Sequence, residues 1–472
     1  MQVLSANVEA RIKHAGTPER FLSSEVALDV EVRALGALAA SPELYPAFLK
    51  LGALTSVLSL LAHDNTDIVA DAVALISELT DAEAAGEAED EVEALLDAVE
   101  REGGFSALAM ALVRMDETSP DEAAAVTGVL ACFENASAAG ERFAAAIVAK
   151  TCFLEWVLKR INVSAFDTNK AAASEVLAIL CQSAPKARDA LVAKEGGLDA
   201  VLRAIAPYKR RAPAGGDEEE HLQNLFDVLC CAVTGSQAGR IAFMAAEGVE
   251  LMCIVARSKE AAPAARVAAF RALDFACARN GAACERLVDV RGLGTVFAAF
   301  MGKGAAAVGK KGKKGDDGDA LSDERVVSLV ASLATELDEA DARLDRLLSK
   351  FVESDYEKLD RLFELLDGYL ERFQYADDAL PANMDEAERE VELLDRGLFS
   401  ARLVGCILAV LWTSGDEGAR FHIIGLLELR GKGRAFVAAL VRDHLAGLGA
   451  DEGNEKLAAR LERAARQVEQ AR

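Results

Sequence analysis

Aromatic residues and prolines are scarce in this chain of 472 residues. Aromatic side chains make up 6% of it and there are nine prolines, whereas alanine and leucine are abundant. Strands are rich in aromatic and β-branched residues, and alanine and leucine favour helix, so the composition predicts an all-α fold. Long apolar runs are also missing. The longest, 403–412, has about ten residues against the roughly 20 that a bilayer requires, and no signal-peptide pattern opens the chain. We therefore expect neither a membrane-spanning nor a secreted protein.

Spacings typical of metal sites and catalytic sites are absent from the sequence too. The nine cysteines include no C-x-x-C pair, the five histidines never pair at i, i+4, and no serine lies in a G-x-S-x-G motif. Cysteines scattered through apolar helical runs are typical of reduced core thiols in an intracellular compartment. We expect no metal, no cofactor and no enzymatic activity.

Acidic residues are in excess. There are 77 of them against 52 Lys and Arg, which gives a formal net charge of −25. A field of this sign repels phosphate backbones and attracts cations. The charge therefore argues against direct nucleic-acid binding and indicates protein partners with basic segments.

One short phrase recurs along the chain: an apolar helix end, a glycine, and a new apolar helix. It occurs around Gly52, Gly104, Gly197, Gly248 and Gly292, and a degenerate copy lies near Cys152. The steps between copies are about 44 to 52 residues, slightly longer than the ~40–47 of armadillo and HEAT units. After the second helix, "HDNTD" supplies Asn65 or Thr66 to cap a third. Such units cannot bury their apolar stripes alone, so they are predicted to stack into a solenoid with a long groove.

This repeat predicts three regions. We expect a helical N-terminal cap over 1–45, about six irregular armadillo repeats over 46–340, and a helical C-terminal cap over 341–472. A disordered Lys/Gly-rich loop is expected near 302–320 and an acidic linker near 376–390.

Several long, polar-rich stretches are more specific than the helical rhythm. They include "LLAHDNTDIVADAVALISELTD", "WVLKRINVSAFDTNKAAASEVLAILCQ" and "LLSKFVESDYEKLDRL". In these stretches, and over nearly all of its length, the chain resembles the beta-catenin-like (catenin-beta-like) family, nuclear armadillo-repeat proteins associated with the Prp-nineteen spliceosomal complex.

The resemblance implies an all-α, right-handed armadillo superhelix with helical end caps. It also implies a nuclear address and a groove for basic, nuclear-localisation-type segments of splicing partners, notably the Myb-related cell-division-cycle protein of that complex. The family's basic N-terminal extension has no counterpart here, so nuclear entry is expected to rest on another segment or on a partner. With only Trp156 and Trp412, the Trp and Asn clamp of the importin-alpha type does not carry over.

Acidic residues on the third helices are the candidate groove residues, because in armadillo stacks these helices line the concave face. Carboxylates there could attract Lys and Arg side chains by charge-assisted hydrogen bonds. For any single one of them, in a chain with 77 acidic residues, an ordinary solvated helix face is the better explanation. The candidates are Asp71, Glu78, Glu134, Glu175, Asp227 and Asp274.

The segment "GKGAAAVGKKGKKGDDGD" contains most of a phosphate-binding G-x-x-x-x-G-K pattern, from Gly304 to Lys310. A P-loop requires Ser or Thr next and a preceding strand, whereas Lys311 follows here and the preceding residues read as helix. We interpret the segment as a loop inserted between the second and third helices of the last repeat. Three roles stay open for it: a plain linker, a nuclear signal, or a self-ligand that competes with partners. Its basic residues are Lys303, Lys310, Lys311, Lys313 and Lys314.

The function predicted is therefore a non-enzymatic scaffold for basic segments of nuclear splicing factors. A cytoplasmic adaptor or transport-receptor-like armadillo protein is the alternative. The sequence leaves homodimer formation open.

Overall fold

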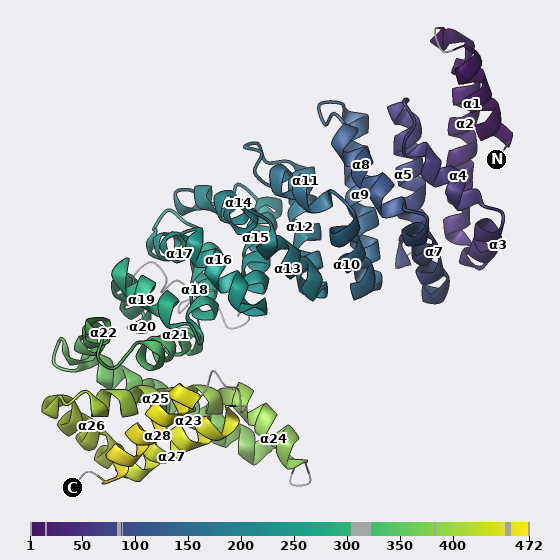
Figure 1. The fold of residues 1–472 in the computed structure, drawn as a ribbon. Coiled ribbons are helices and arrows are strands. Elements are labelled where there is room, and N and C mark those ends of the chain that lie inside the picture. The colour runs from purple at the N-terminus through teal and green to yellow at the C-terminus, as the bar shows by residue number, and fades with distance from the viewer. Residues whose placement is uncertain are drawn as a thin grey trace. The chain divides into compact units, whose positions relative to one another are not determined.

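The computed structural model describes residues 2–14, 17–82, 86, 88–303, 322–381, 384–448 and 455–470. Within these ranges every regular element is a helix and there is no strand, which confirms the all-α prediction. The chain divides into two compact units (Figure 1). Unit 1 comprises Met1–Pro207 and Pro213–Ala246, and unit 2 comprises Tyr208–Ala212 and Glu247–Arg472.

Unit 1 is a succession of short helices that follow one another in threes after an N-terminal pair. Its α-helices are α1 (Gln2–Lys13), α2 (Leu22–Leu35), α3 (Tyr45–Lys50), α4 (Ala53–Leu60), α5 (Thr66–Thr80), α7 (Glu89–Arg101), α8 (Gly104–Arg114), α9 (Pro120–Ala139), α10 (Glu141–Lys150), α11 (Phe153–Arg160), α12 (Thr168–Ser183), α13 (Pro185–Ala193), α14 (Gly197–Ile205), α15 (Gly216–Gly235) and α16 (Gln237–Ala245). Short 3₁₀ helices η1 (Pro18–Arg20), η2 (Gly36–Ala40) and η3 (Pro42–Leu44) connect the first of them.

Unit 2 continues the same plan and ends in longer helices. Its α-helices are α17 (Gly248–Arg257), α18 (Pro263–Cys277), α19 (Gly281–Asp289), α20 (Leu293–Phe300), α21 (Asp323–Glu336), α22 (Ala342–Val352), α23 (Glu357–Ala379), α24 (Glu386–Leu393), α25 (Phe399–Thr413), α26 (Glu417–Leu429), α27 (Arg434–Gly447) and α28 (Glu455–Gln470). The Lys-rich segment lies between α20 and α21, the second and third helices of one triplet, as predicted, and residues 304–321 lie outside the described residues. Because α23 runs to Ala379 and α24 begins at Glu386, the break between them is shorter than the acidic linker expected over 376–390.

Glycine starts the second helix of several triplets, in a slightly different way from the prediction. In "GG" the first residue, Gly196, is the left-handed one (φ +70), and Gly197 is already helical. A Cβ on Gly197 would lie 2.2 Å from the carbonyl oxygen of Leu191, so the second glycine permits close helix packing. At the last copy the left-handed position is held by Arg291 (φ +63), and Gly292 has an ordinary helical φ of −66. At these copies the turn therefore lies one residue earlier than the sequence phrase suggested, whereas at Gly52 (φ +67) the glycine itself is left-handed, as predicted.

The third helices form the centre of unit 1. Helix α5 packs against α9, α9 against α12, and α12 against α15, so that these helices stand side by side (Figure 1). Asn65 caps α5 as predicted, accepting the N–H of Asp67 at 3.0 Å. Phe133 of α9 is fully buried, with its ring 6.3 Å from that of Phe105 and 4.8 Å from that of Phe153. These aromatic contacts tie the third helix α9 to α8 and α11, the second helices of its own and the next triplet.

A buried arginine connects two successive triplets. Arg160, at the end of α11, donates to both carboxylate oxygens of Glu117 at 2.8 and 2.9 Å and to Asp167 at 2.5 Å. Asn169 donates to the same Glu117 carboxylate at 2.8 Å. Because these bonds join the loops before α9 and α12, they fix the register of the two third helices.

In unit 2 the last helix reaches back to a third helix. Arg460 of α28 donates to the carbonyl oxygens of Ala334, Thr335 and Leu337, at 3.1, 2.8 and 2.7 Å, at the end of α21. Those carbonyls belong to the last turn of a helix, where intrahelical partners are lacking. The guanidinium of Arg460 therefore caps α21. No described helix has both the length and the apolar character needed to cross a bilayer.

Candidate peptide-binding groove

A groove of about 600 Å³ lies along the third helices near the start of unit 1. Helix α2 forms one wall, α5 the floor and α9 the other wall, since α2 and α9 both pack against α5. We call it the N-terminal groove. Its charged residues are Glu25, Asp29, Arg33, Asp67, Asp71 and Asp121, and its uncharged ones include Leu22, Val26, Ala70, Ala74, Ala124 and Gly128.

Small side chains keep the groove open. Ala70 and Ala74 lie along the floor, and Ala124 and Gly128 lie on the α9 wall. A Cβ on Gly128 would lie only 2.8 Å from Cγ1 of Val73, which is fully buried in α5. The absence of that Cβ lets α9 approach α5 closely.

Two carboxylates on facing helices share one arginine. Arg33 of α2 contacts Asp29 at 2.9 Å on its own helix and Asp71 of α5 at 3.1 Å. The Asp71 side chain is 14% exposed, and its Oδ2 is buried with no hydrogen-bond partner among the described residues. Burial, together with the neighbouring Asp29 carboxyl, raises the pKa of Asp71 to about 6. At neutral pH this carboxylate is mostly ionised. Because it is largely buried, its charge is less well solvated than that of a surface aspartate.

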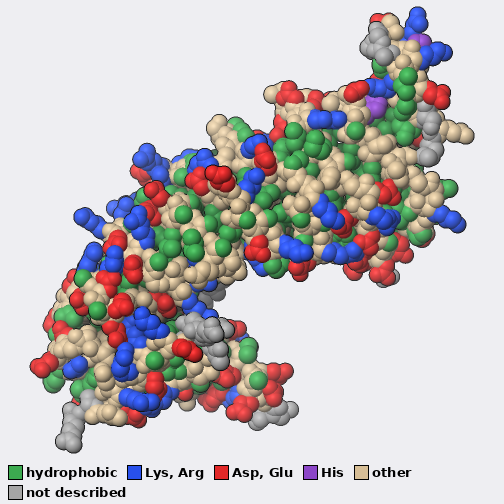
Figure 2. All heavy atoms as spheres, in the orientation of Figure 1, with side chains coloured by type: hydrophobic (Ala, Val, Ile, Leu, Met, Phe, Trp, Pro, Cys, Tyr) green, Lys and Arg blue, Asp and Glu red, His purple; other side chains and the backbone are tan. Residues whose placement is uncertain are grey.

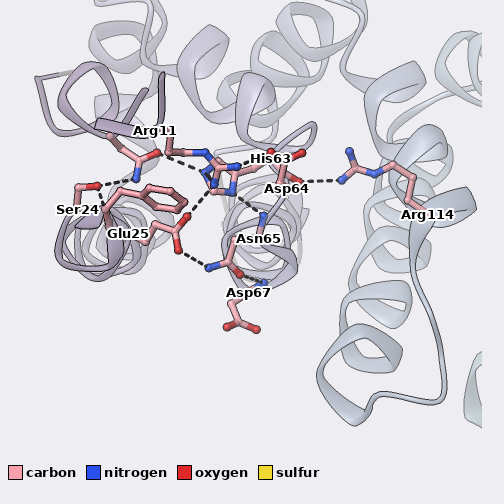
Figure 3. Close-up of polar contacts among 10 residues, drawn as sticks. Arg11, Ser24, Glu25, His63, Asp64, Asn65, Asp67 and Arg114 are labelled. Atoms are coloured by element: carbon pink, nitrogen blue, oxygen red, sulfur yellow. Dashed lines mark hydrogen bonds and ion pairs between the residues drawn. The ribbon is translucent and has the colours of Figure 1, made fainter. Parts of the chain in front are cut away.

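A polar network fixes one end of the groove (Figure 3). Arg11 of α1 donates to Glu25 at 2.7 Å, and Asn65, the cap of α5, donates to the other oxygen of Glu25 at 3.1 Å. His63 lies 3.1 Å from Arg11, and burial and that guanidinium lower the pKa of His63. Arg114 of α8 donates at 3.2 Å to the His63 carbonyl. Glu25 is therefore committed to Arg11 and Asn65, and its role is to join α1, α2 and α5.

The remaining charges leave the groove acidic. Asp67 and Asp121 are exposed in the first turns of α5 and α9, and Asp29 and Asp71 have only Arg33 between them. First-turn aspartates also interact favourably with the helix dipole, which gives them a structural role as well. Together these four carboxylates form a negative lining that basic side chains could neutralise.

Another acidic surface in unit 1 is partly engaged in ion pairs between helices. Figure 2 shows acidic side chains gathered where Figure 1 labels α7. There Arg142 of α10 pairs with Glu93 at 2.5 Å and with Asp97, and Lys150 pairs with Glu100 at 2.7 Å. These pairs serve the packing of α7 on α10, whereas the N-terminal groove is a hollow lined by carboxylates and small side chains.

The six acidic residues predicted from the sequence do not come together at one place. Asp71 lines the N-terminal groove, Glu78 and Glu175 are exposed, and Glu134 and Asp227 are half-buried on α9 and α15. Asp274, in unit 2, is only 7% exposed and lies 3.4 Å from Arg325, and burial raises its pKa to about 6. The third helices thus carry these carboxylates, but in different environments.

Helix α2 supplied the groove residues that the sequence reading missed. The sequence places this helix in the predicted N-terminal cap, so Leu22, Val26 and Asp29 are not among the predicted groove residues. Their spacing of three and four residues places them on one helix face, which was a usable signal. Asp67 and Asp121 were readable as first-turn acids after the capping residues Asn65 and Ser119.

The Lys-rich segment contributes one described residue. Lys303 lies 3.8 Å from Glu357, and both belong to unit 2. Lys310, Lys311, Lys313 and Lys314 lie outside the described residues. Across the described ranges there is no group of three or more His, Cys, Asp or Glu side chains placed to hold a metal ion.

The fold defines the class of protein. Helix triplets whose third helices stand in a row are the architecture of armadillo-repeat proteins, which typically act as non-enzymatic scaffolds. A structure from work on the interaction between cadherin and beta-catenin aligns over 98% of this chain and 80% of its own, with a TM-score of 0.53 and 16% identity. A crystal structure of an engineered protein aligns over 99% of both chains, with a TM-score of 0.51 and 16% identity.

The sequence comparisons go further than the fold. Residues 2–442 match the family described as "Catenin-beta-like, Arm-motif containing nuclear". Human beta-catenin-like protein 1 is 33% identical over 460 residues, 94% of this chain and 79% of its own. The Schizosaccharomyces pombe homolog is 32% identical over 420 residues, 87% of this chain and 71% of its own. The chain therefore belongs to the catenin-beta-like family of nuclear armadillo-motif proteins.

Proposed function

We propose that this protein is a scaffold that docks basic segments of nuclear splicing proteins, and that the N-terminal groove is a docking site. The observation that carries the proposal is the four carboxylates of Asp29, Asp67, Asp71 and Asp121 around a single lining cation, Arg33. Lys and Arg side chains entering the groove would make charge-assisted hydrogen bonds there. The choice of splicing partners rests on the family resemblance, which implies the Prp-nineteen complex and its Myb-related cell-division-cycle protein.

Electrostatics would give such docking two properties. The chain's net charge of −25 would raise the encounter rate with basic segments. The affinity would also fall with salt, since the Debye length shortens from about 10 Å at 0.1 M to about 3 Å at 1 M. Charges on exposed groove residues such as Asp67 and Asp121 would be screened first.

The test is capture of proteins from nuclear extract by the full chain at low and at raised salt. We expect Prp-nineteen-complex proteins at low salt and their loss at raised salt. The Asp67→Asn/Asp121→Asn double variant should weaken capture about fivefold, taking each exposed charge at roughly 0.5 kcal/mol. The matched control is Glu93→Gln/Asp97→Asn on α7, which removes two charges outside the groove. Salt-insensitive capture, or equal loss in the control, would refute the docking mechanism, and absence of these proteins would refute the splicing role.

A further inference from the structure

An unpartnered apolar stripe runs along α2 beside the carboxylates. Leu22, Val26 and Val30 are 58%, 56% and 61% exposed, and they are spaced four residues apart on one side of the helix. The opposite side of α2 packs into the protein, since Leu28 and Val32 are buried in the core. Large apolar side chains that are exposed along one face of a helix indicate a binding surface.

Two residues of the stripe lie in the same groove as the carboxylates. Leu22 and Val26 line it together with Asp29 of the same helix and Asp71 of α5. A purely cationic peptide would cover Leu22 and Val26 with groups that lose water there and gain no partner. The complementary ligand therefore carries basic side chains on one side and apolar side chains on another.

The dimensions of the groove favour a helical ligand. Packed helices have axes roughly 8–10 Å apart, so the axes of α2 and α9, which both pack on α5, are at most roughly 16–20 Å from one another. A ligand helix laid over α5 could therefore pack against both α2 and α9 at the same axis distance of roughly 8–10 Å. The small floor residues Ala70 and Ala74 leave room for it. From Leu22 to Val30 the stripe runs for about 12 Å, or roughly two helical turns, at 1.5 Å per residue.

We infer that the N-terminal groove receives an amphipathic helix of a partner protein, whose apolar side packs on Leu22 and Val26 and whose Lys and Arg side chains reach Asp29, Asp67, Asp71 and Asp121. This inference rests on the proposed function and narrows it. Basic charge alone is not sufficient for this site. The partner's segment must also present apolar residues at i, i+3 or i+4 and i+7, the spacing of helix-in-groove anchors.

Two labelled peptides of equal length, composition and charge would test the inference with the full chain. One places Leu and Lys in an amphipathic helical pattern, and the other scrambles them so that no face forms. Fluorescence anisotropy gives both affinities. We expect the patterned peptide to bind about tenfold tighter or more, and to gain helicity on binding by circular dichroism.

Variants then locate the effect. Leu22→Ser/Val26→Ser should weaken the patterned peptide about tenfold and leave the scrambled peptide unchanged. Both side chains are exposed, so folding should survive. The matched control is Met110→Ser/Val113→Ser on α8, whose side chains are 55% and 58% exposed and do not line the groove.

The outcomes separate the two proposals. Equal binding of both peptides, with loss only in Asp67→Asn/Asp121→Asn, would overturn the helix inference and leave the basic-segment function standing. Binding of neither peptide would count against the proposed function itself. Equal weakening in the α8 control, or no gain of helicity, would overturn the inference. So would a change from dimer to monomer caused by Leu22→Ser/Val26→Ser in sedimentation, since the occupant would then be a second copy of this chain.

Discussion

Binding of a basic peptide to the N-terminal groove should weaken as pH falls through 6, because of Asp71. The pKa of this carboxyl is raised to about 6 by burial and by the adjacent Asp29. Protonation removes the negative charge that faces the ligand. The charged groups that line the groove with Asp71 are Glu25, Asp29 and Arg33 on α2, Asp121 on α9 and Asp67 on its own helix. The half-buried His63 lies at the end of the groove.

The size of the effect follows from the titration of one group. With a pKa of about 6, about a quarter of the Asp71 carboxyls are ionised at pH 5.5 and nearly all at pH 7.5. If the ligand cation binds only the ionised form, the dissociation constant rises about fourfold between these two values. An ordinary surface aspartate, with a pKa near 3.9, would change the affinity by only a few per cent over the same range.

Anisotropy titrations of a histidine-free basic peptide at pH 7.5 and 5.5 would measure this ratio. Asp71→Asn should bind more weakly at pH 7.5 and should lose the fourfold pH dependence, while every other titrating group remains. The control is Asp274→Asn, because the pKa of Asp274 is also raised to about 6 and it lies in unit 2. A fourfold ratio that persists in Asp71→Asn, or disappears in Asp274→Asn, would refute the reasoning.

Three further predictions concern stability. Gly128→Ala should cost about 1–3 kcal/mol in urea unfolding, since its Cβ would press on the buried Val73, whereas Gly235→Ala meets only the flexible Arg188 side chain and should cost less. Arg160→Ala should cost about 2–4 kcal/mol, because it leaves Glu117 and Asp167 without their shared cation. The exposed Arg142→Ala is its control and should change little. Asp71→Asn should raise the melting temperature more at pH 7.5 than at pH 5, because a raised carboxyl pKa means that stability falls as pH rises from about 4 to about 6.

The sequence was sufficient to predict the helices, because their causes are local. Asn65 precedes an apolar stripe and caps α5, and the glycine phrase marks where second helices begin. The left-handed residue is Gly52 itself at the first copy, as predicted. At the Gly-Gly copies and in "VRG" it lies one residue before the predicted position, since either residue of a Gly-Gly pair can adopt this conformation and Arg291 does so in "VRG".

The groove was harder to predict because it depends on which surfaces meet. Helix α2 has two apolar sides, and the sequence does not distinguish the buried Leu28 and Val32 from the exposed Leu22 and Val26. Asp71 and Asp274 likewise occupy similar places on third helices. Arg325, which lies 51 residues further along the chain, covers Asp274, whereas Asp71 faces the open groove.

The cap that Arg460 provides for α21 affects the order in which unit 2 can be completed during synthesis. The two partners are 123 to 126 residues apart, in a protein whose other contacts described above mostly join neighbouring triplets. At about 5–20 residues per second, the ribosome would deliver Arg460 some 6 to 25 seconds after α21. Until then the carbonyls of Ala334, Thr335 and Leu337 lack the hydrogen bonds that Arg460 donates to them. Helix α28 is therefore the last helix to join unit 2. A nascent chain that paused before α28 was made would leave the C-terminal end of α21 uncapped and accessible to chaperones.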